Sequence, residues 1–432
     1  MPRSTSTRSR FVAGVGAAAV SSLLALTACA PTPEAQPTPT PSAVMETPAP
    51  EPYAGPALFV GDELNRFLLS SEEIVELLPD STDIGAASSV LTMISDGGGP
   101  DPVPEICGTF FWEESLGSVG SRNIEWSVAG GGDRGYGHLI ALQFADEKQA
   151  QRRMDQRIAA AEQCATFDYN GPASFESVVP EAEDGVRAMA GTLQLPELEG
   201  ASRGFSAFAS VGNVLVQLWQ TQGSGDVPDA GAIAELLQAR AAEARATLID
   251  ELTANPPTTE DEPEIDAAAP WSDWEIAFGG VGPIRLGDPI DTAVAAGRAA
   301  QTVEPEYERG PWTLVNGEGS ASMSILPAAD GTTTASITVG NASSIDDTPQ
   351  DGASLPSARG TRVGDPVADA IAAFPGGTTV SVTSSSDDWY EIATRDGRLL
   401  RFYTDRDVAD EGAVIVGIAV EDATLRTSPS FG

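Results

Sequence analysis

Histidine, lysine, cysteine and positive charge are all scarce in this chain of 432 residues. It has one histidine, three cysteines and a single lysine, Lys148. A zinc cluster on four thiolates therefore cannot form, and a Schiff-base or Ser–Lys mechanism has one candidate lysine at most. Lys and Arg number 24 against 63 Asp and Glu, so the formal net charge is -39. Because phosphate backbones are bound by clustered Lys and Arg, we expect no nucleic-acid partner.

The remaining composition is that of a folding chain, with 41% hydrophobic and 20% charged residues. Its length suggests two or three domains. The predicted fold class is α+β, with two globular regions in which helices pack on antiparallel sheets. The predicted segments are a signal peptide at 1–28, a lipidated cysteine and Pro-rich stalk at 29–56, a first globular region at 57–252, an acidic Pro-rich linker at 253–270 and a tandem-repeat region at 271–432.

The first 28 residues have the layout of a secretory signal peptide. Three arginines precede an uncharged apolar run at 11–26, which glycines and serines interrupt. This run is shorter than the roughly 20 apolar residues of a spanning helix. It ends in Leu26-Thr27-Ala28-Cys29, which resembles a bacterial lipobox. The resemblance implies that Cys29 takes a diacylglycerol and tethers the chain to the outer face of the cell membrane. The alternative is an ordinary signal peptide with an incidental cysteine.

Two proline-rich segments predict linkers. Residues 30–56 contain nine prolines, and an extended polyproline stalk at roughly 3.1 Å per residue would reach about 80 Å at most. Residues 253–270 contain four prolines and five acids with no apolar periodicity. We expect this second segment to be solvated and self-repelling, and to separate the two globular regions.

The first globular region alternates helix and strand signals. Ser70 and Glu73 form a capping-box pattern before an apolar helical face. Asp146 is placed to cap a helix that runs to about Gln163. Strands are expected at 122–128, 137–144, 186–193, 204–210 and 214–219, and a last helix after Pro228. His138 lies in the second strand beside core residues, so we expect a half-buried structural histidine and not a catalytic base.

Cys107 and Cys164 are the cysteines that remain once Cys29 is acylated. In an oxidising compartment they have no other partner, so we predict a disulfide between them. Closing a loop of about 58 residues would stabilise the fold by roughly 4 kcal/mol on the chain-entropy account. The alternatives are two free buried cysteines or a reactive cysteine.

This region contains, in order, Leu68–Ile74, Pro104–Cys107, Ile124–Val128, Leu139–Phe144, Cys164, Arg203 and Gly212–Val216. Together these segments resemble the extracellular sensor domain of PknH-type actinobacterial kinases. The resemblance covers roughly residues 57–250. It implies an envelope sensor or binding module, which the family places on kinases and on free-standing lipoproteins. Such domains typically have two disulfides, whereas this chain has cysteines for one, and no kinase domain accompanies it.

The second globular region contains an internal repeat. Residues 285–290 (Arg-Leu-Gly-Asp-Pro-Ile) recur at 362–367 (Arg-Val-Gly-Asp-Pro-Val), an offset of 77 that also relates Trp312 to Trp389. We expect two α+β units, at about 280–355 and 357–428, that form one sheet or two sheets sharing a core. Each should begin with a glycine turn, an aspartate N-cap and a proline at the first helical position. The layout is similar to β-lactamase-inhibitor-protein and BamE-like repeats, both protein-binding folds.

No motif positions a nucleophile, a cofactor or a metal. The basic residues Lys148, Arg152, Arg153 and Arg157 are expected on the solvated face of a helix, with an anion site as the alternative. Trp312 and Trp389 of the repeat are expected in its core, with the lining of a ligand groove as the alternative. Calcium binding is an alternative at two acidic groups that lack the spacing of a calcium loop. They are Asp346 with Asp347, and Asp405 with Asp407, Asp410 and Glu411.

These observations predict a non-enzymatic lipoprotein of the cell envelope. Its lipid on Cys29 would bind the membrane, and its partner would be an extracytoplasmic protein or a wall component. The sequence identifies no catalytic residue, no metal ligand and no cofactor, and it leaves the ligand-binding residues unknown. One alternative is a protein inhibitor or assembly factor that acts through the repeat. The other is a hydrolase with an unrecognised site.

Overall fold

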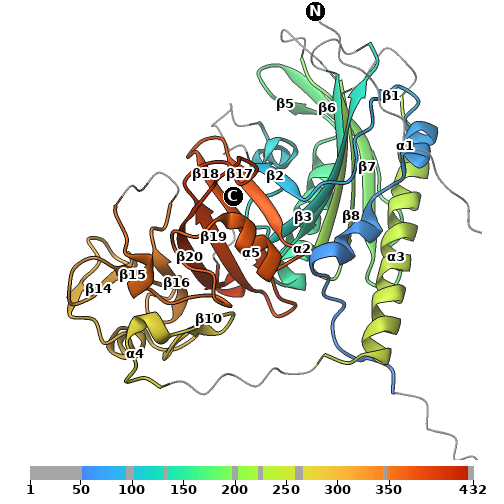
Figure 1. Cartoon of the computed structure of the whole chain (residues 1–432). Coiled ribbons are helices and arrows are strands. Elements are labelled where there is room, and N and C mark those ends of the chain that lie inside the picture. The colour runs from blue at the N-terminus through green and yellow to red at the C-terminus, as the bar shows by residue number, and fades with distance from the viewer. Residues whose placement is uncertain are drawn as a thin grey trace, which may run out of the picture. The chain divides into compact units, whose positions relative to one another are not determined.

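The computed structural model describes residues 51–93, 102–130, 135–196, 203–221, 227–257, 266–343, 346 and 348–426 (Figure 1). The predicted signal peptide, Cys29 and most of the stalk lie outside these residues. Pro50–Gly432 forms one compact unit. At the end of the predicted stalk, the Tyr53 backbone N–H donates to Thr253 Oγ1 at 2.9 Å. No helix of the described part of the chain is long and apolar enough to cross a membrane.

The first region is built on an eight-stranded antiparallel sheet with the order β1-β3-β4-β9-β8-β7-β6-β5. Its strands are β1 (Ser81–Thr82), β3 (Gly120–Val128), β4 (Tyr136–Gln143), β5 (Phe167–Asp168), β6 (Pro172–Val178), β7 (Arg187–Gln194), β8 (Arg203–Val211) and β9 (Val214–Thr221). The strands predicted from period-two patterns correspond to β3, β4, β7, β8 and β9. The α+β class predicted for the chain is the one observed.

A helix covers each face of this sheet. On β8, Phe205 and Ala207 belong to the core beneath α3 (Ala230–Ala254), while Phe208 belongs to the core beneath α2 (Glu147–Gln163). This alternation follows from the two-residue period of a strand. Figure 1 shows α3 running alongside β7 and β8. The shorter α1 (Ser71–Leu77) begins with the predicted capping box of Ser70 and Glu73.

Two 3₁₀-helices complete the first region, η1 (Gly61–Phe67) and η2 (Glu105–Phe111). Cys107 of η2 is disulfide-bonded to Cys164, which directly follows α2, with a Cα–Cα distance of 5.8 Å. Both cysteines are fully buried in the core that α2 covers. The predicted pairing is therefore the one that the structure shows.

The second region is built on a nine-stranded sheet with the order β13-β14-β15-β16-β20-β19-β18-β17-β2. The strands are β13 (Gln301–Val303), β14 (Trp312–Val315), β15 (Ser322–Pro327), β16 (Thr334–Gly340), β17 (Thr378–Val382), β18 (Asp387–Ala393), β19 (Arg398–Thr404), β20 (Ile415–Asp422) and β2 (Val90–Met93). Two short helices, α4 (Ile290–Ala296) and α5 (Val367–Ala373), pack on one face. A small sheet of β10 (Ile276–Ala277), β11 (Gly280–Val281) and β12 (Ile284–Arg285) accompanies them, with η4 (Trp271–Asp273), η5 (Gly352–Ser354) and η6 (Ala423–Leu425).

The predicted repeat is visible as a helix followed by four strands, twice. Ile290 and Val367, the first residues of α4 and α5, stand 77 positions apart. The two units meet through their last strands, because β16 pairs antiparallel with β20. Of the two arrangements left open by the sequence, the structure has the single continuous sheet.

Two details of the repeat differ from the sequence-based expectation. The N-cap positions of α4 and α5 are Pro289 and Pro366, with no side-chain cap, so the predicted aspartate caps are wrong. The predicted proline at the first helical position is also wrong, because the first helical residues are Ile290 and Val367. Asp365 instead accepts a hydrogen bond from the Arg362 backbone N–H at 2.8 Å, inside the turn that precedes the helix. Gly364 of this turn has φ +93°, a conformation that favours glycine.

The two regions are joined through β2. This strand lies between α1 and η2 in the sequence, yet it pairs in parallel with β17 at the edge of the second sheet. Nearby, the Ser121 N–H donates to Thr378 Oγ1 at 2.9 Å, and Arg122 Nη2 donates to the Gly376 carbonyl at 2.7 Å. The domain boundaries at 252 and 271 stay predictions. Helix α3 extends two residues past the first of them, to Ala254.

Candidate ligand-binding pocket

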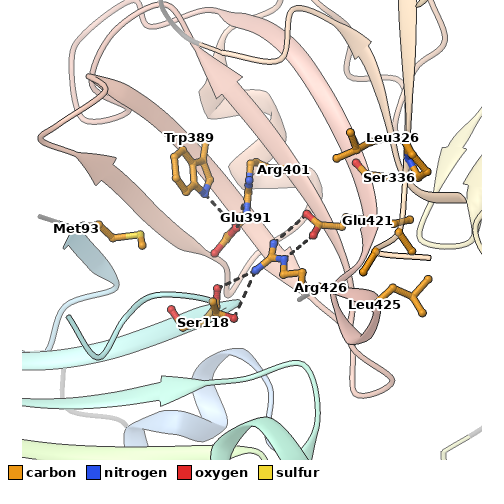
Figure 2. Close-up of a pocket in the computed structure, with 15 residues that line it drawn as sticks. Met93, Ser118, Leu326, Ser336, Trp389, Glu391, Arg401, Glu421, Leu425 and Arg426 are labelled. Atoms are coloured by element: carbon orange, nitrogen blue, oxygen red, sulfur yellow. Dashed lines mark hydrogen bonds and ion pairs between the residues drawn. The ribbon is translucent and has the colours of Figure 1, made fainter. Parts of the chain in front are cut away.

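A cavity of about 450 Å³ lies on the face of the nine-stranded sheet that α4 and α5 do not cover. Leu400 and Phe402 of β19 point into the core beneath those helices. Because strand side chains alternate, Arg401 between them faces the opposite side, toward the cavity. The first region contributes Met93 and Ser118 to the wall (Figure 2). The pocket is therefore formed by both regions of the chain.

Four charged side chains meet in this pocket: Glu391, Arg401, Glu421 and Arg426, together named the charged cluster (Figure 2). Their side chains are only 2% to 20% exposed. Glu391 of β18 and Arg401 of β19 are direct cross-strand partners. Arg426 follows η6 and reaches back to Glu421 on β20. Two negative and two positive charges thus neutralise one another, which is the condition for burying charge at low cost.

The first ion pair of the cluster is held by three donors on one oxygen. Glu391 Oε2 accepts hydrogen bonds from Arg401 Nη2 at 3.0 Å, Arg401 Nε at 3.2 Å and Trp389 Nε1 at 3.0 Å. The Arg401 guanidinium also lies 4.5 Å from the centroid of the Trp389 ring, a cation–π geometry. On its other side, Arg401 Nη1 donates to the Tyr403 hydroxyl at 3.2 Å. These contacts fix the guanidinium in place.

The second ion pair is bidentate. Arg426 Nε lies 2.5 Å from Glu421 Oε1, and Arg426 Nη2 lies 2.9 Å from Glu421 Oε2. Planar fork geometry of this kind is the strongest arrangement of arginine with a carboxylate. Arg426 Nη1 also points toward the Gly117 and Ser118 carbonyls, at the long distances of 3.5 Å and 3.4 Å. Arg426 thereby connects the second region to the loop before β3.

The charges of the cluster shift their own pKa values. Burial raises the pKa of Glu421, but the charge and hydrogen bonds of Arg426, together with Arg401, lower it further, to about 2. Burial lowers the pKa of Arg401, yet Tyr403, Glu391 and Glu421 more than compensate and leave this pKa raised. The pKa of Arg426 is raised in the same way, with Glu421 outweighing burial. These three groups stay ionised at neutral pH.

Two polar atoms of the pocket have no hydrogen-bond partner among the described residues. Glu391 is 2% exposed, and all its hydrogen bonds fall on Oε2, which leaves Oε1 without one. In Figure 2 this second oxygen points away from Trp389 and Arg401, toward the side of the pocket that Met93 and Ser118 line. Ser118 is 7% exposed, and its buried hydroxyl also has no partner.

The sequence did not single out the charged cluster. A signal for it exists in the strand register of the repeat. The first unit pairs Thr313 with Ser324 at the place where the second unit pairs Glu391 with Arg401. The charged pair is therefore present in the second repeat unit and absent from the equivalent position of the first. The sequence offset of 77 hides this, because it matches Glu391 with Leu314.

The tryptophans matched by the same offset lie on opposite faces of the sheet. Trp312 is half-buried against the core beneath the helices, and Leu314, two residues later, is fully buried in that core. Trp389 belongs to the core between the two regions, while its neighbour Tyr390 faces the helices. Both tryptophans are packed as expected, but their equivalence is wrong by one residue, which is enough to exchange faces.

The expectation of a solvated basic face on α2 is wrong for two of its four residues. Arg153 and Arg157 are 8% and 3% exposed. Arg157 forms a buried ion pair with Glu114 and lies 4.6 Å from the Phe208 ring centroid. Arg153 Nη2 donates to the Leu116 carbonyl at 2.7 Å. The segment after η2 covers this side of the helix, so the arginines join elements of the fold and do not present an anion site.

His138 lies half-buried in β4, stacked on Trp219 with 5.9 Å between ring centroids. Burial lowers the pKa of this imidazole, while a hydrogen bond with Gln217 and the charge of Glu125 partly oppose the shift. Within the described residues, no serine, threonine or cysteine side chain hydrogen-bonds to it. Its setting is that of a packed aromatic side chain.

The acidic groups considered for calcium are engaged in local turns. Asp405 accepts from Arg406 and from the Val414 N–H, and Asp407 accepts from the Ala409 N–H. Asp347 lies outside the described residues. Across the described ranges, no group of three or more His, Cys, Asp or Glu side chains is arranged to hold a metal ion.

Comparison with known proteins gives similarity at the level of the structure alone. No family model matches the sequence, and no curated protein matches it. The structure is similar to the extracellular domain of PknH from Mycobacterium tuberculosis, with 15% identity and a TM-score of 0.29 over 48% of this chain and 99% of that one. It is also similar to an uncharacterised protein of Mycobacterium smegmatis, the Rv0999 orthologue, with 14% identity and a TM-score of 0.24 over 42% of this chain and 96% of that one.

A PknH-like extracellular domain was predicted from the sequence of the first region, and the similarity found is to such a domain. The similarity of the repeat units to BamE-like and β-lactamase-inhibitor-protein units stays a prediction.

Proposed function

We propose that this chain is a non-enzymatic binding module of the cell envelope, anchored by a lipid on Cys29, whose ligand occupies the pocket of the charged cluster. The observation that supports this most is the 450 Å³ cavity itself, with Glu391 Oε1 open to it. Pockets of roughly 300–1,000 Å³ that combine apolar walls with a few fixed polar groups are typical of small-ligand sites. The walls here include Leu326, Pro327 and Leu425.

The electrostatics of the pocket favour binding over catalysis. A general acid or base works best with a pKa near the operating pH. Glu421 has its pKa lowered to about 2, and both arginines have theirs raised, so these groups do not exchange protons near neutral pH. They act as fixed charges that orient a ligand. The hydrolase alternative would need a nucleophile beside such a site, and within the described residues none is paired with His138.

The location proposed rests on the lipobox-like segment that ends at Cys29. With a net charge of -39, the chain should be repelled by an anionic bilayer. The lipid would therefore supply the attachment, and the Pro-rich stalk at 29–56 would supply distance from the surface.

Native mass spectrometry of the protein isolated from envelopes tests the binding role. Wild type should retain a small molecule, and Ala329→Trp should lose it, because Ala329 is an exposed residue on the rim of the pocket. Ala409→Trp is the matched control, since Ala409 is exposed and lies outside the pocket lining. Equal retention by all three proteins, or an empty wild type after incubation with an envelope extract, would contradict the proposal.

Anchorage is tested separately. Cys29→Ser should abolish incorporation of labelled fatty acid and release the chain from membranes. A variant that is still acylated and membrane-bound would show that the lipobox interpretation is wrong.

A further inference from the structure

The chemistry of the pocket also identifies a class of ligand, an inference that rests on the proposed function. Buried polar atoms without a partner are uncommon in folded proteins. Ser118 Oγ is one such atom, and Glu391 Oε1, which accepts no hydrogen bond from the described residues, is open to the same side of one cavity (Figure 2). A ligand that satisfies both would remove the free-energy cost of leaving them unpaired.

The missing partner must be a donor. An ionised carboxylate can only accept hydrogen bonds, whereas a serine hydroxyl can donate or accept. An ammonium group has three donors and can serve Glu391 Oε1 and Ser118 Oγ at once. A hydroxyl could also satisfy both atoms, by donating to Glu391 Oε1 and accepting from the Ser118 hydroxyl, but it carries no charge. A hydrogen bond between an ammonium and a carboxylate is charge-assisted and roughly twice as strong as a neutral one, so a protonated amine is favoured at this side of the pocket.

Charge balance requires a second group on the ligand. The charged cluster is neutral as it stands, so an ammonium alone would leave an unbalanced positive charge in a largely buried site. Arg426 Nη1 offers a place for a compensating anion. Its contacts with the Gly117 and Ser118 carbonyls, at 3.5 Å and 3.4 Å, are at the outer limit of hydrogen bonding. A ligand carboxylate would give this nitrogen a shorter, charge-assisted bond.

Much of the remaining wall of the pocket is apolar. This part is formed by Leu326, Pro327, Ala328, Ala335 and Leu425, and Ser336 adds a polar residue to the lining. Leu326 is 42% exposed, and an apolar group in the pocket would cover it and remove apolar surface from water. A volume of about 450 Å³ leaves room for a side chain of this kind beside the two charged groups of the ligand.

We infer that the pocket binds a zwitterion with an apolar side chain, namely a free α-amino acid or a short unblocked peptide. Its ammonium group bonds to Glu391 Oε1 and Ser118 Oγ, and its carboxylate bonds to Arg426 Nη1. Its side chain lies against Leu326 and Leu425.

Calorimetric titration of the full chain, purified in detergent, tests the inference. The probes are L-leucine and L-alanyl-L-leucine, and the blocked controls are leucinamide and N-acetyl-leucine. We expect at least one of the two zwitterions to bind, and each compound that lacks one of the charges to bind at least tenfold more weakly. Comparison of leucine with the dipeptide distinguishes an amino acid from a peptide ligand. Binding of the blocked compounds as tight as that of the zwitterions would overturn the inference.

Variants of the lining residues test whether the zwitterion binds in this pocket. Glu391→Gln should weaken zwitterion binding at least tenfold, and Ser118→Ala should weaken it several-fold while retaining the ion pairs. Ala329→Trp should abolish it, and Ala409→Trp should leave it unchanged. Melting temperatures of all variants show whether they fold, and Ser118→Ala keeps the test informative if Glu391→Gln does not. Unchanged binding by folded Ser118→Ala and Ala329→Trp would overturn the placement.

The two proposals can fail independently. A small molecule that is retained from envelopes, is lost from Ala329→Trp and lacks an amine or a carboxylate would overturn the zwitterion inference and support the binding role. A pocket that takes up neither the probes nor an envelope compound would overturn both.

Discussion

The Glu421–Arg426 pair makes the stability of the second region dependent on pH. Unfolding exposes Glu421 to water, where its pKa returns to 4.5, whereas in the folded chain Arg426 and Arg401 outweigh burial and hold it at about 2. Between these values the unfolded state binds a proton that the folded state does not. Acid therefore favours unfolding in this window. The stabilisation is fully present above pH 4.5 and is lost as the pH falls through 2.

The magnitude follows from the two pKa values. A difference of one pKa unit corresponds to about 1.4 kcal/mol, so a shift from 4.5 to about 2 contributes on the order of 3 kcal/mol at neutral pH. Glu421→Gln removes the titrating group and keeps the size of the side chain. We expect this variant to be less stable than wild type by about that amount at pH 7, since it also leaves Arg426 without its charged partner.

Urea denaturation of both proteins at intervals from pH 7 to pH 2 measures the effect. The stability gap should be constant above pH 4.5, shrink by about 1.4 kcal/mol per pH unit below it, and close near pH 2. Glu318→Gln is the matched control, because Glu318 is exposed and should give a gap near zero throughout. A gap for Glu421→Gln that does not change with pH would refute the reasoning, since it would mean that the pair contributes through packing alone.

Two further predictions concern the disulfide and the non-covalent contacts between the two regions. Replacing Cys107 and Cys164 together with alanine should lower the free energy of unfolding by about 4 kcal/mol on the chain-entropy account. Denaturation of oxidised wild type, reduced wild type and the variant measures this, and equal stability of the three would refute it. Protease cleavage within 253–270 should leave two pieces that co-elute in size-exclusion chromatography until denaturant is added, because β2 pairs with β17 and Arg122 donates to Gly376. Separation of the pieces under native conditions would mean that these contacts do not hold the two regions together.

Helices α1, α2 and α3 and strands β3, β4, β7, β8 and β9 of the first region could be predicted because each is encoded locally. Apolar periodicity and the caps Ser70 and Asp146 are sufficient to locate α1 and α2. The environment of a polar helix face is not encoded in the same way. Arg153 and Arg157 have the spacing of a solvated face, and only the segment that contains Glu114 and Leu116 decides that they are buried.

Strand β2 shows a second limit. It has four residues, Val90–Met93, and its partner β17 lies almost 300 positions later in the chain. Its burial pattern is set by this distant pairing, so no local period distinguishes it from a loop. Dividing the chain at the linker therefore separates β2 from the sheet to which it belongs. It also separates Met93 from the pocket that this residue lines.

The pocket could not be predicted because its residues become neighbours only through strand register. Duplication of a sheet unit preserves the residues that face the helices, such as Met323 and Leu400, since both copies need the same core. The opposite face is free to differ. In the first unit it pairs Thr313 with Ser324, and in the second it pairs Glu391 with Arg401.

The first region allows the second repeat unit to carry a buried ion pair. Met93 and Ser118 close the space over Glu391 and Arg401 and shield them from water. On an open sheet the same ion pair would be solvent-exposed and would contribute little, about 0–1 kcal/mol. Binding chemistry would therefore have become possible in this repeat only where another part of the chain covers it. In the first unit Thr313 and Ser324 hold the equivalent position with uncharged side chains, and neither of them lines the pocket of the charged cluster.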